Sequence, residues 1–300
     1  MIYDAIVIGG GPAGMSAALN LKRLGKSVLI LERNAFGGQI ADSPRVENIP
    51  GFKEISGLDY SSLVFDQISD LGVDFELEEV KKLEKVDGIF KVTTDYQTHE
   101  SKVVIIAAGL VHRHMNIARE EELVGKGVSY CAVCDGAFYK DEDVAVIGDA
   151  NTALQYALNL STYCKKVHLC MLFDRFFADK TLVDRVLDND KIDVTKEISL
   201  KEFVGENELE GLIFENTKTH EEVKFDVKGC FIAIGQVPQN NIFADLVDLE
   251  RGFILTDENM RTKTPGLYAI GDCRKKAYCQ VSIAISEGLI AAINASNSLD

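Results

Sequence analysis

Residues 9–14 read Gly-Gly-Gly-Pro-Ala-Gly, and this stretch decides how the chain folds. A β-rich run, residues 3–8, comes directly before it, and residues 12–24 after it have helical character up to a stop at Gly25. Residues 27–31 are β-rich again. The order strand, glycine turn, helix and strand predicts a βαβ unit.

The glycine stretch fits the pattern G-x-G-x-x-G of dinucleotide-binding turns. Gly9, Gly11 and Gly14 would allow a tight turn, close approach of the backbone to a pyrophosphate, and close packing of helix on strand. Glu32 ends the next strand 18 residues after Gly14, where a carboxylate accepts a hydrogen bond from a ribose 2′-hydroxyl. The unit is therefore predicted to bind a dinucleotide, and a purely structural glycine turn is the alternative.

A second unit of the same kind begins about 135 residues later, with a strand at 144–147, a helix at 151–163 and a strand at 166–172. Alternating stretches at 89–94, 212–215 and 222–226 are typical of antiparallel hairpins. The predicted fold class is α/β, with two Rossmann-like, two-dinucleotide-binding three-layer domains that carry small antiparallel β insertions.

Composition agrees with two domains and excludes several kinds of partner. The chain has 300 residues, 46% of them hydrophobic, and a formal net charge of −15, which argues against binding to nucleic acid or to an acidic membrane. No apolar run is long enough to span a membrane. Seven cysteines without a secretory signal predict a cytoplasmic protein with reduced thiols, in which a closely spaced pair would be catalytic or metal-binding.

Four further segments carry a resemblance. They are Gly37-Gly38-Gln39, Glu47-Asn48-Ile49-Pro50-Gly51, Ala107-Ala108-Gly109, and the late Gly271-Asp272 that precedes a helix predicted at 281–296. Together with the first glycine turn they resemble the FAD domain of the two-dinucleotide flavoprotein disulfide reductases. The alternative for Asp272 is that it caps the last helix.

This resemblance implies FAD as cofactor. It implies that Asp272 contacts the ribityl chain or a phosphate, that Asn48 and Gln39 lie on the ring system, and that Gln280 with Val281 lines the pyrimidine edge. The complete set of implied FAD-binding residues is Gly9, Gly11, Pro12, Ala13, Gly14, Glu32, Gly38, Gln39, Asn48, Ala108, Gly271, Asp272, Gln280 and Val281.

The redox chemistry is predicted at Cys131-Ala132-Val133-Cys134-Asp135. A C-x-x-C pair cycles between dithiol and disulfide because one turn brings the sulfurs together. A zinc site would need about four ligands, and the sequence has no second C-x-x-C or H-x₃₋₅-H, so no metal is predicted. Asp135 is suited to move a proton to or from a sulfur, or to act as an ordinary N-cap.

The longer string C-A-V-C-D-G-A-F-Y-K, residues 131–140, is similar to the active-site segment of the low-molecular-weight thioredoxin reductases. This resemblance spans residues 2 to about 295. It implies that Cys134 faces the flavin, that Cys131 attacks the disulfide of a thioredoxin, and that Asp135 is the acid. It also implies a homodimer.

The second glycine turn departs from that family. It reads Gly148-Asp149-Ala150, so a Cβ and a carboxylate stand where a pyrophosphate would approach. In place of the family's H-R-R-x-x-x-R segment, whose arginines bind the 2′-phosphate of NADPH, residues 171–177 read Met-Leu-Phe-Asp-Arg-Phe-Phe. The three arginine positions are occupied by Leu172, Phe173 and Phe177, so forked recognition of a phosphate has no donor there.

Two explanations compete. Asp174 could accept a hydrogen bond from the 2′-hydroxyl of NADH, which leaves Asp149 and Ala150 unexplained. Alternatively the second domain has lost its nucleotide, a pattern similar to the ferredoxin-dependent flavin thioredoxin reductases of anaerobic bacteria. A ferredoxin near −400 mV would drive reduction of a thioredoxin near −270 mV by roughly 6 kcal/mol for two electrons.

The sequence therefore predicts an oxidoreductase that passes electrons from reduced ferredoxin to FAD, to Cys131 and Cys134, and to thioredoxin. The FAD domain is expected at 1–111 with 242–300, and the domain without its nucleotide at 112–241. The alternatives are an NAD(P)H-dependent thioredoxin reductase with an unusual site, a flavin-dependent dithiol oxidase, and an interaction protein that only holds flavin.

Surface features are predicted as well. Arg274-Lys275-Lys276 is a candidate ferredoxin contact or simply a solvated face, and Glu120-Glu121-Glu122 is expected to be a solvated loop. His112 and His114 are expected to be linker residues. Three cysteines are expected to be small buried apolar residues, namely Cys164, Cys170 and Cys230.

Overall fold

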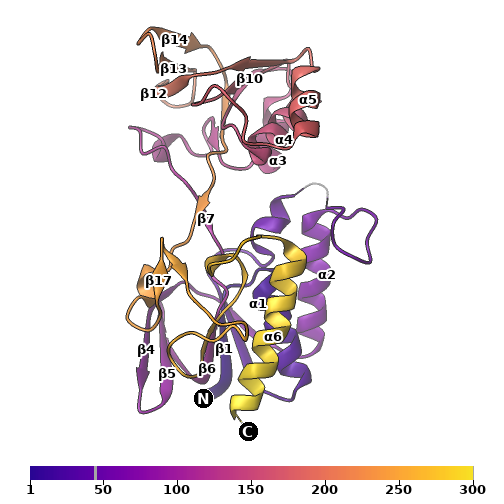
Figure 1. Ribbon diagram of the computed structural model, residues 1–300, viewed down its shortest axis with the longest axis vertical. Coiled ribbons are helices and arrows are strands. Elements are labelled where there is room, and N and C mark those ends of the chain that lie inside the picture. Colours follow the sequence, from indigo (N-terminus) through magenta and orange to yellow (C-terminus); the bar gives the residue numbers. More distant parts are fainter. Residues whose placement is uncertain (44–45, 300) are drawn as a thin grey trace. The chain divides into compact units, whose positions relative to one another are not determined.

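The computed structural model of the protein describes residues 1–43 and 46–299, and the chain forms two compact units (Figure 1). Unit 1 comprises Met1–Val111 and Val237–Asp300, and unit 2 comprises His112–Gln236. Unit 1 is thus discontinuous. It resumes at Val237, five residues before the position expected from sequence. The short strands β7 (Val111–His112) and β16 (Gln236–Val237) pair where the chain passes between the units.

Seven strands form the sheet of unit 1, in the order β3-β2-β1-β6-β5-β4 with β19 also paired to β6. They are β1 (Ile2–Ile8), β2 (Val28–Glu32), β3 (Asp74–Leu77), β4 (Val80–Val86), β5 (Ile89–Thr94), β6 (Thr98–Ile106) and β19 (Leu267–Ala269). Strands β1, β2, β3, β6 and β19 pair in parallel, whereas β4, β5 and β6 pair antiparallel. Strand β6 therefore joins a parallel nucleotide-binding sheet to an antiparallel insertion.

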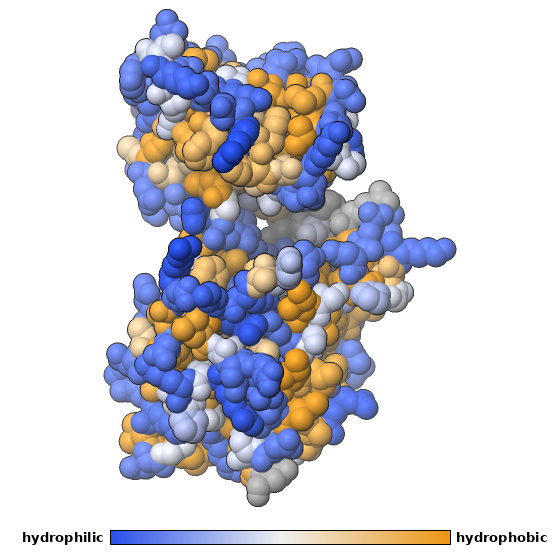
Figure 2. Space-filling view, viewed as in Figure 1, coloured by the Kyte–Doolittle hydropathy of each residue, from blue (hydrophilic) through white to orange (hydrophobic). Residues whose placement is uncertain are grey.

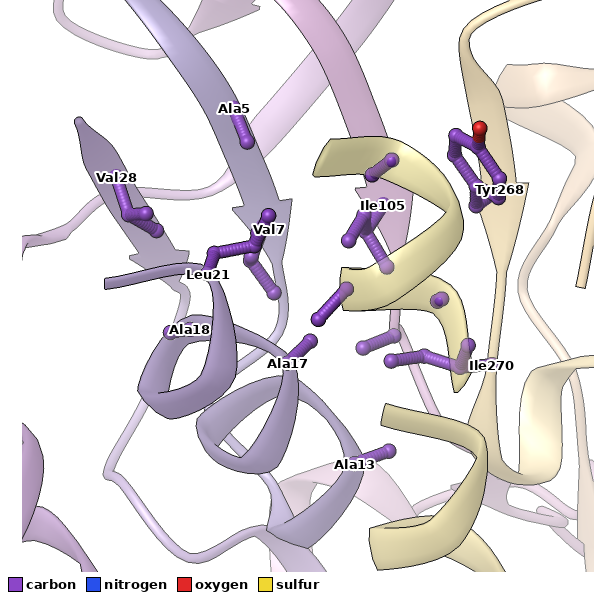
Figure 3. Close-up of a cluster of buried hydrophobic side chains, with 14 of the residues drawn as sticks. Ala5, Val7, Ala13, Ala17, Ala18, Leu21, Val28, Ile105, Tyr268 and Ile270 are labelled. Atoms are coloured by element: carbon purple, nitrogen blue, oxygen red, sulfur yellow. The ribbon is translucent and has the colours of Figure 1, made fainter. Parts of the chain in front are cut away.

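Both faces of the parallel strands are buried, which explains why these strands are almost continuously apolar. Alternate residues of β1, such as Val7 and Ile8, enter two different core clusters. One cluster lies under α1 (Pro12–Arg23), α2 (Gly57–Asp70) and α6 (Val281–Leu299), which run along one side of the sheet in Figure 1. Figure 3 shows Ala13, Ala17 and Ala18 of α1 within this cluster. The other cluster contains residues of β4 and β5 and of the segment 243–254.

Five parallel strands form the main sheet of unit 2, in the order β11-β10-β9-β15-β8. They are β8 (Val128–Ser129), β9 (Asp143–Ile147), β10 (Lys166–Cys170), β11 (Ile192–Thr195) and β15 (Gly229–Ile232). The helices are α3 (Ala132–Asp135), α4 (Asn151–Leu160) and α5 (Lys180–Leu187). A separate antiparallel sheet contains β12 (Ile198–Val204), β13 (Gly211–Asn216) and β14 (Glu222–Phe225).

The main sheet of unit 2 is covered on both faces. Val144 and Val146 of β9 pack with residues of α4 in one cluster, and Ala145 and Ile147 pack with residues of β12 and β13 in the other. Helix, parallel sheet and small antiparallel sheet are three layers. The predicted α/β class with two Rossmann-like units and antiparallel insertions is confirmed.

Element ends differ from the sequence expectation by a few residues. Helix α4 ends at Leu160 rather than 163, β10 ends at Cys170 rather than 172, and α6 continues to Leu299 rather than 296. The early end of β10 has a structural consequence. The chain after Met171 leaves the sheet and returns to the second glycine turn, where Phe177 forms an isolated bridge with Ala150.

Candidate functional site

The first glycine turn follows β1 and is shaped by contacts that only glycine allows. Gly9 has φ +110°, and a Cβ on it would lie 2.3 Å from the carbonyl oxygen of Ala107. A Cβ on Gly14 would lie 1.9 Å from the carbonyl oxygen of Gly9, so the start of α1 touches the turn. Pro12 occupies the first turn of α1. A Cβ on Gly11, by contrast, would meet nothing nearer than 3.9 Å, which leaves open space above the helix N-terminus.

Glu32 stabilises this turn from the end of β2. Its Oε2 accepts a hydrogen bond from the Gly10 amide at 2.6 Å, and its Oε1 accepts one from the Asn34 amide at 2.9 Å. Each carboxylate oxygen keeps a second lone pair. Glu32 can therefore shape the turn and still accept a hydrogen bond from a hydroxyl group of a ligand.

A second turn, at Gly37-Gly38-Gln39, lies against the first. Gly37 and Gly38 have φ +111° and +58°, and the Gly37 amide donates to the Gly10 carbonyl at 2.9 Å. A Cβ on Gly38 would lie 3.3 Å from the Cα of Gly11. The side chain of Gln39 donates to the Leu110 carbonyl at 2.8 Å. Two glycine turns thus meet at the carboxyl end of β1.

Asn48 and Gln280 lie together although 232 residues separate them. Asn48 Nδ2 donates to Gln280 Oε1 at 3.0 Å, directly before α6 begins at Val281. Ala108 follows β6, and the amide of its neighbour Ala107 donates to the Ile8 carbonyl. The two glycine turns, Gln39 and Ala108 therefore lie at the carboxyl ends of β1 and β6, where parallel sheets bind dinucleotides, and Asn48 and Gln280 lie together at the start of α6.

Asp272 lies in a short 3₁₀ turn, Gly271–Cys273, nine positions before α6, so it does not cap that helix. Its Oδ1 is buried, lies 2.9 Å from Lys276 Nζ, and accepts no hydrogen bond with acceptable geometry within the described part of the chain. The adjacent Gly271 amide donates to Glu287 at 2.7 Å. A buried acceptor beside a cation and a glycine turn fits contact with a hydroxyl group of a cofactor.

The basic triplet near Asp272 is not an exposed patch, which corrects the sequence expectation. The side chains of Arg274 and Lys276 are only 13% and 7% exposed. Arg274 Nη1 donates to buried Glu287 at 2.7 Å, and Lys276 lies 3.4 Å from the same carboxylate. Lys275 alone is exposed, and it pairs with Glu250. The ion pairs of Arg274 and Lys276 with Glu287 therefore stabilise unit 1, and of the three basic residues only Lys275 is available to attract an acidic partner.

In unit 2 the C-x-x-C segment follows β8. Cys131 is disulfide-bonded and α3 begins at the next residue; the side chain of Cys134 lies outside the described part of the structure. Asp135 is the last residue of α3 and not its N-cap. Its Oδ2 accepts a hydrogen bond from Ser129 Oγ at 2.6 Å, and the same Oγ accepts one from the Cys131 amide at 3.0 Å. The structure thus brings Cys131 and Asp135 together through Ser129.

Tyrosine hydroxyls hold the backbone around Cys131. Tyr156 on α4 donates to the Tyr130 carbonyl at 3.0 Å, and Tyr163 donates to the Ala132 carbonyl at 3.4 Å. Tyr130 donates through its own hydroxyl to Glu120 Oε1 at 2.6 Å. Burial and this bond raise the pKa of Tyr130 above its usual range. The segment is therefore rigidly supported from two sides.

Glu120 was expected in a solvated loop, and this expectation is wrong. Its side chain is 3% exposed and accepts hydrogen bonds from the amides of Met115 and Asn116 as well as from Tyr130. His114, expected to be a linker residue, lies 2.8 Å from the Tyr130 hydroxyl through its Nδ1.

The three expected structural cysteines, Cys164, Cys170 and Cys230, are free and buried, as predicted.

The second glycine turn, after β9, is covered by the chain itself. The Phe177 amide donates to the Asp149 carbonyl at 2.8 Å, and Phe177 bridges to Ala150. At the first residue of α4, Asn151 accepts from the Asp179 amide at 2.7 Å and donates to the Asp179 carboxylate at 3.0 Å. Burial raises the pKa of the nearby Asp149 carboxyl. A helix N-terminus that attracts anions is here faced by carboxylates of the same chain.

The residues that replace the family's arginines are exposed and apolar. Leu172, Phe173 and Phe177 are 48%, 50% and 49% exposed, and the two phenylalanine rings meet edge to face at 5.5 Å. Arg175 lies over the Phe177 ring at 4.8 Å. The one arginine of this segment is thus engaged with an aromatic ring.

Two negative findings apply to the part of the chain that the structure describes. Within residues 1–43 and 46–299, no group of three or more His, Cys, Asp or Glu side chains could hold a metal ion. Over the same residues, no helix is long and apolar enough to cross a membrane.

Two nucleotide-type folds, a glycine-turn cradle and a disulfide-bonded cysteine at a helix start define an oxidoreductase acting on disulfides. The chain belongs to the pyridine nucleotide-disulphide oxidoreductase family, whose pattern matches residues 3–288. Proteins of this family and its thioredoxin reductases are FAD flavoproteins, which confirms the predicted cofactor.

Individual relatives agree over the full chain. A thioredoxin reductase of Listeria monocytogenes is 39% identical over 298 residues, which cover 98% of this chain and 93% of that protein. The crystal structure of Lactococcus lactis thioredoxin reductase in its FR conformation superposes with a TM-score of 0.93 at 34% identity and covers 99% of both chains. A ferredoxin-flavin thioredoxin reductase from Clostridium acetobutylicum superposes with a TM-score of 0.55 at 28% identity, over 99% and 98% of the two chains.

Sequence reasoning missed several residues of the site, among them Ser129, Tyr156 and Glu287. Ser129 stands two positions before Cys131, and Glu287 is the only acidic residue within α6. An acidic side chain in an otherwise uncharged helix is a signal for a buried ion pair and could have been used. A single serine before a cysteine belongs to no recognisable pattern.

Proposed function

We propose that this protein is a thioredoxin reductase, which reduces the disulfide of a thioredoxin through FAD and the pair Cys131 and Cys134. The observation that carries the proposal is the disulfide-bonded Cys131 whose amide shares the Ser129 hydroxyl with Asp135. The end-to-end similarity to the Lactococcus lactis and Listeria monocytogenes enzymes supports it.

The proposed FAD site uses the residues gathered at the carboxyl ends of β1 and β6. The amides of the Gly9–Gly14 turn and the N-terminus of α1 would receive the pyrophosphate, and Glu32 a ribose hydroxyl. Asp272, whose buried Oδ1 is paired with Lys276 but accepts no well-aligned hydrogen bond, would accept one from a hydroxyl of the ribityl chain. Gln39, Asn48, Gln280 and Val281 would lie along the ring system. Bound FAD supplies the collection of two electrons and their delivery to a disulfide.

Cys131, Cys134 and Asp135 have separate proposed roles in the exchange of the disulfide with thioredoxin. In the dithiol state, the thiolate of Cys131 attacks the partner disulfide and expels one partner sulfur, which takes up a proton from Asp135. The second enzyme thiol, from Cys134, gives its proton to Asp135 and attacks the Cys131 sulfur of the mixed disulfide, and the second thioredoxin sulfur leaves with that proton from Asp135. The products are the enzyme disulfide and the dithiol of thioredoxin.

For the electron donor, the comparisons favour NAD(P)H, because the family is one of pyridine nucleotide enzymes and the more similar relatives are plain thioredoxin reductases. The ferredoxin-flavin enzyme is a more distant structural neighbour. The sequence expectation of a ferredoxin donor therefore has less support from the comparisons than its NAD(P)H alternative.

Ferredoxin is kept as a second candidate donor because of the second glycine turn. Phe177 is hydrogen-bonded to this turn, Asp179 pairs with the first residue of α4, and exposed phenylalanines replace the phosphate-binding arginines. Each lost charge-assisted contact to a phosphate costs about 1.5–3 kcal/mol, so three losses imply NADPH affinity weaker by about three orders of magnitude or more. The basic triplet 274–276 does not strengthen the case, since Arg274 and Lys276 are buried in ion pairs.

Anaerobic stopped-flow mixing decides between the donors. The oxidised protein is mixed separately with NADPH, NADH and reduced ferredoxin while the flavin absorbance is followed, and turnover is measured with thioredoxin. Bleaching by micromolar NADPH or NADH at catalytic rates identifies a pyridine nucleotide enzyme. Bleaching by ferredoxin alone identifies the second candidate. Reduction of thioredoxin by none of the three contradicts the proposed function, and oxygen consumption with small dithiols would then indicate the dithiol oxidase.

We propose that the protein is a homodimer in the cytoplasm. The free cysteines and the family resemblance are in keeping with this proposal. Unit 1 exposes apolar side chains on α2 and α6, among them Leu58, Leu63, Leu289 and Ile293, and Figure 2 shows apolar surface in the region of α6. Light scattering after size exclusion should give twice 33.0 kDa, and a mass of one chain would contradict the dimer.

A further inference from the structure

We infer that Ser129 is a positioning residue that holds the Asp135 carboxyl for proton transfer at the cysteine pair. The inference rests on the proposed disulfide chemistry but not on thioredoxin as the substrate. It is drawn from one buried hydroxyl that joins the Cys131 backbone to the Asp135 side chain.

Ser129 is held firmly enough to orient another group. It is the last residue of β8 and is 3% exposed, and β8 pairs in parallel with β15 through Ser129 and Phe231. Its Oγ lies 2.6 Å from Asp135 Oδ2, a distance typical of a strong hydrogen bond to a carboxylate. A serine anchored in a sheet thus sets the orientation of an aspartate at the end of a four-residue helix.

The same hydroxyl also accepts the Cys131 amide at 3.0 Å. One oxygen therefore connects the backbone of the attacking cysteine with the side chain of the acid. Without the serine, the backbone bond from the Asp135 amide to the Cys131 carbonyl at 3.2 Å would remain. That bond maintains α3 but does not constrain the direction of the Asp135 carboxyl.

The chemistry depends on where this carboxyl points. When the Cys131 thiolate attacks a disulfide, a new S–S bond forms, the old one breaks, and the leaving sulfur must be protonated if it is a poor leaving group. An alkyl thiol with an ordinary pKa needs the proton, whereas an aromatic thiol of low pKa leaves as the thiolate. Ser129 should therefore matter for alkyl disulfides and not for activated aromatic ones.

The test uses full-length protein reduced with dithiothreitol and freed of reductant under nitrogen. Single-turnover rates are measured with hydroxyethyl disulfide, with thioredoxin, and with dithiobis(nitrobenzoate), whose leaving thiol is acidic. In Ser129→Ala we expect about a tenfold or larger loss of rate with the two alkyl disulfides and little change with the aromatic one. Ser129→Thr keeps the hydroxyl and should restore the rates.

A pH series adds a second readout. The limb of the pH–rate profile that Asp135→Asn abolishes should move to higher pH in Ser129→Ala, because a carboxylate that loses a donated hydrogen bond takes up its proton more readily. Ser161→Ala is the matched control, since Ser161 is also buried in unit 2 but bonds to the Leu158 carbonyl and the Asn189 side chain, not to the Cys131 backbone or Asp135. Its rates and profile should match the unmodified protein.

Equal slowing of all three disulfides in Ser129→Ala would indicate a merely structural serine and would overturn the inference. Unchanged rates with alkyl disulfides would also overturn it. Failure of the proposed function looks different: the unmodified protein would reduce hydroxyethyl disulfide but not thioredoxin, while the effect of Ser129→Ala on the alkyl disulfide remained.

Discussion

Glu32 combines two tasks at the scale of a single residue. Its carboxylate accepts two backbone amides, from Gly10 and Asn34, and is the proposed acceptor for a ribose hydroxyl. Replacement by glutamine keeps the size but removes the charge. Glu32→Gln should purify with less than half of the FAD per chain found in the unmodified protein, measured from the ratio of flavin to protein absorbance.

The control for this prediction is Glu122→Gln, because Glu122 is a surface residue, 73% exposed, that pairs only with Arg119 at 3.4 Å. It should retain a full complement of FAD. Full retention of FAD in Glu32→Gln as well would show that this carboxylate does not hold the cofactor.

Cys131 supports a second prediction at this scale. Cys131→Ser removes the sulfur proposed to attack thioredoxin and leaves the residues around FAD unchanged. The flavin should remain reducible by the true donor, while thioredoxin turnover falls at least a thousandfold. Steady-state assays with either donor measure this loss. Turnover near the normal rate would mean that another cysteine attacks the thioredoxin disulfide, and the exposed Cys279 would be examined first.

Asp4 predicts a pH effect on stability. The Asp4 carboxylate accepts hydrogen bonds from Lys102 and from the amide and hydroxyl of Ser27, which lower its pKa to about 2. A lowered pKa stabilises the fold above the unfolded value near 3.9, and this contribution disappears as the pH falls toward 2. Because the side chain is 24% exposed, we expect a contribution of about 1–2 kcal/mol at neutral pH.

Urea unfolding of Asp4→Asn and the unmodified protein at several pH values measures this contribution. The difference in free energy of unfolding should be constant from pH 7 to 5 and shrink between pH 4 and 3. A difference that stays the same at pH 3 would mean that the loss has another cause, such as altered packing.

At the scale of elements, the contact between α1 and α6 is made by a glycine. A Cβ on Gly288 would lie 2.5 Å from the Ala13 carbonyl oxygen and 2.8 Å from Ser16 Cβ. Gly288→Ala should therefore push the helices apart and destabilise unit 1 by about 1–3 kcal/mol, although alanine is the better helix former. Urea unfolding measures the change, and Ser286→Ala on the exposed side of α6 is the control. A stabilised Gly288→Ala would contradict this packing.

How much the sequence could predict also depends on the element. The first βαβ unit was predictable because glycines 9, 11 and 14 and Glu32 stand at the spacing of a dinucleotide-binding turn. Gly14 and Glu32 also make their contacts within this stretch, to Gly9 and Gly10. The burial of Glu120 and Lys276 was not predictable, because a run of three acidic or three basic residues is expected to be solvated until its partners distant in sequence are known. Tyr130 buries Glu120, and Glu287, eleven residues on, buries Lys276.

At the scale of the whole molecule, the two units have separate cores. The clusters of unit 2 contain only residues between 115 and 234. A fragment of residues 112–236 should therefore fold cooperatively by itself, with a single unfolding transition followed by circular dichroism and by tyrosine fluorescence. Gradual, probe-dependent unfolding would show that unit 2 needs unit 1 for its packing.

The discontinuity of unit 1 has a consequence for biosynthesis. A ribosome delivers β1, α1 and β6 first, then all of unit 2, and only afterwards β19, Asp272 and α6. The nascent chain can complete unit 2 while the first half of unit 1 still lacks the strand beside β6 and the helix beside α1. The proposed FAD site is therefore completed only at the very end of translation, so a chain truncated before residue 272 should emerge colourless even when unit 2 is fully folded.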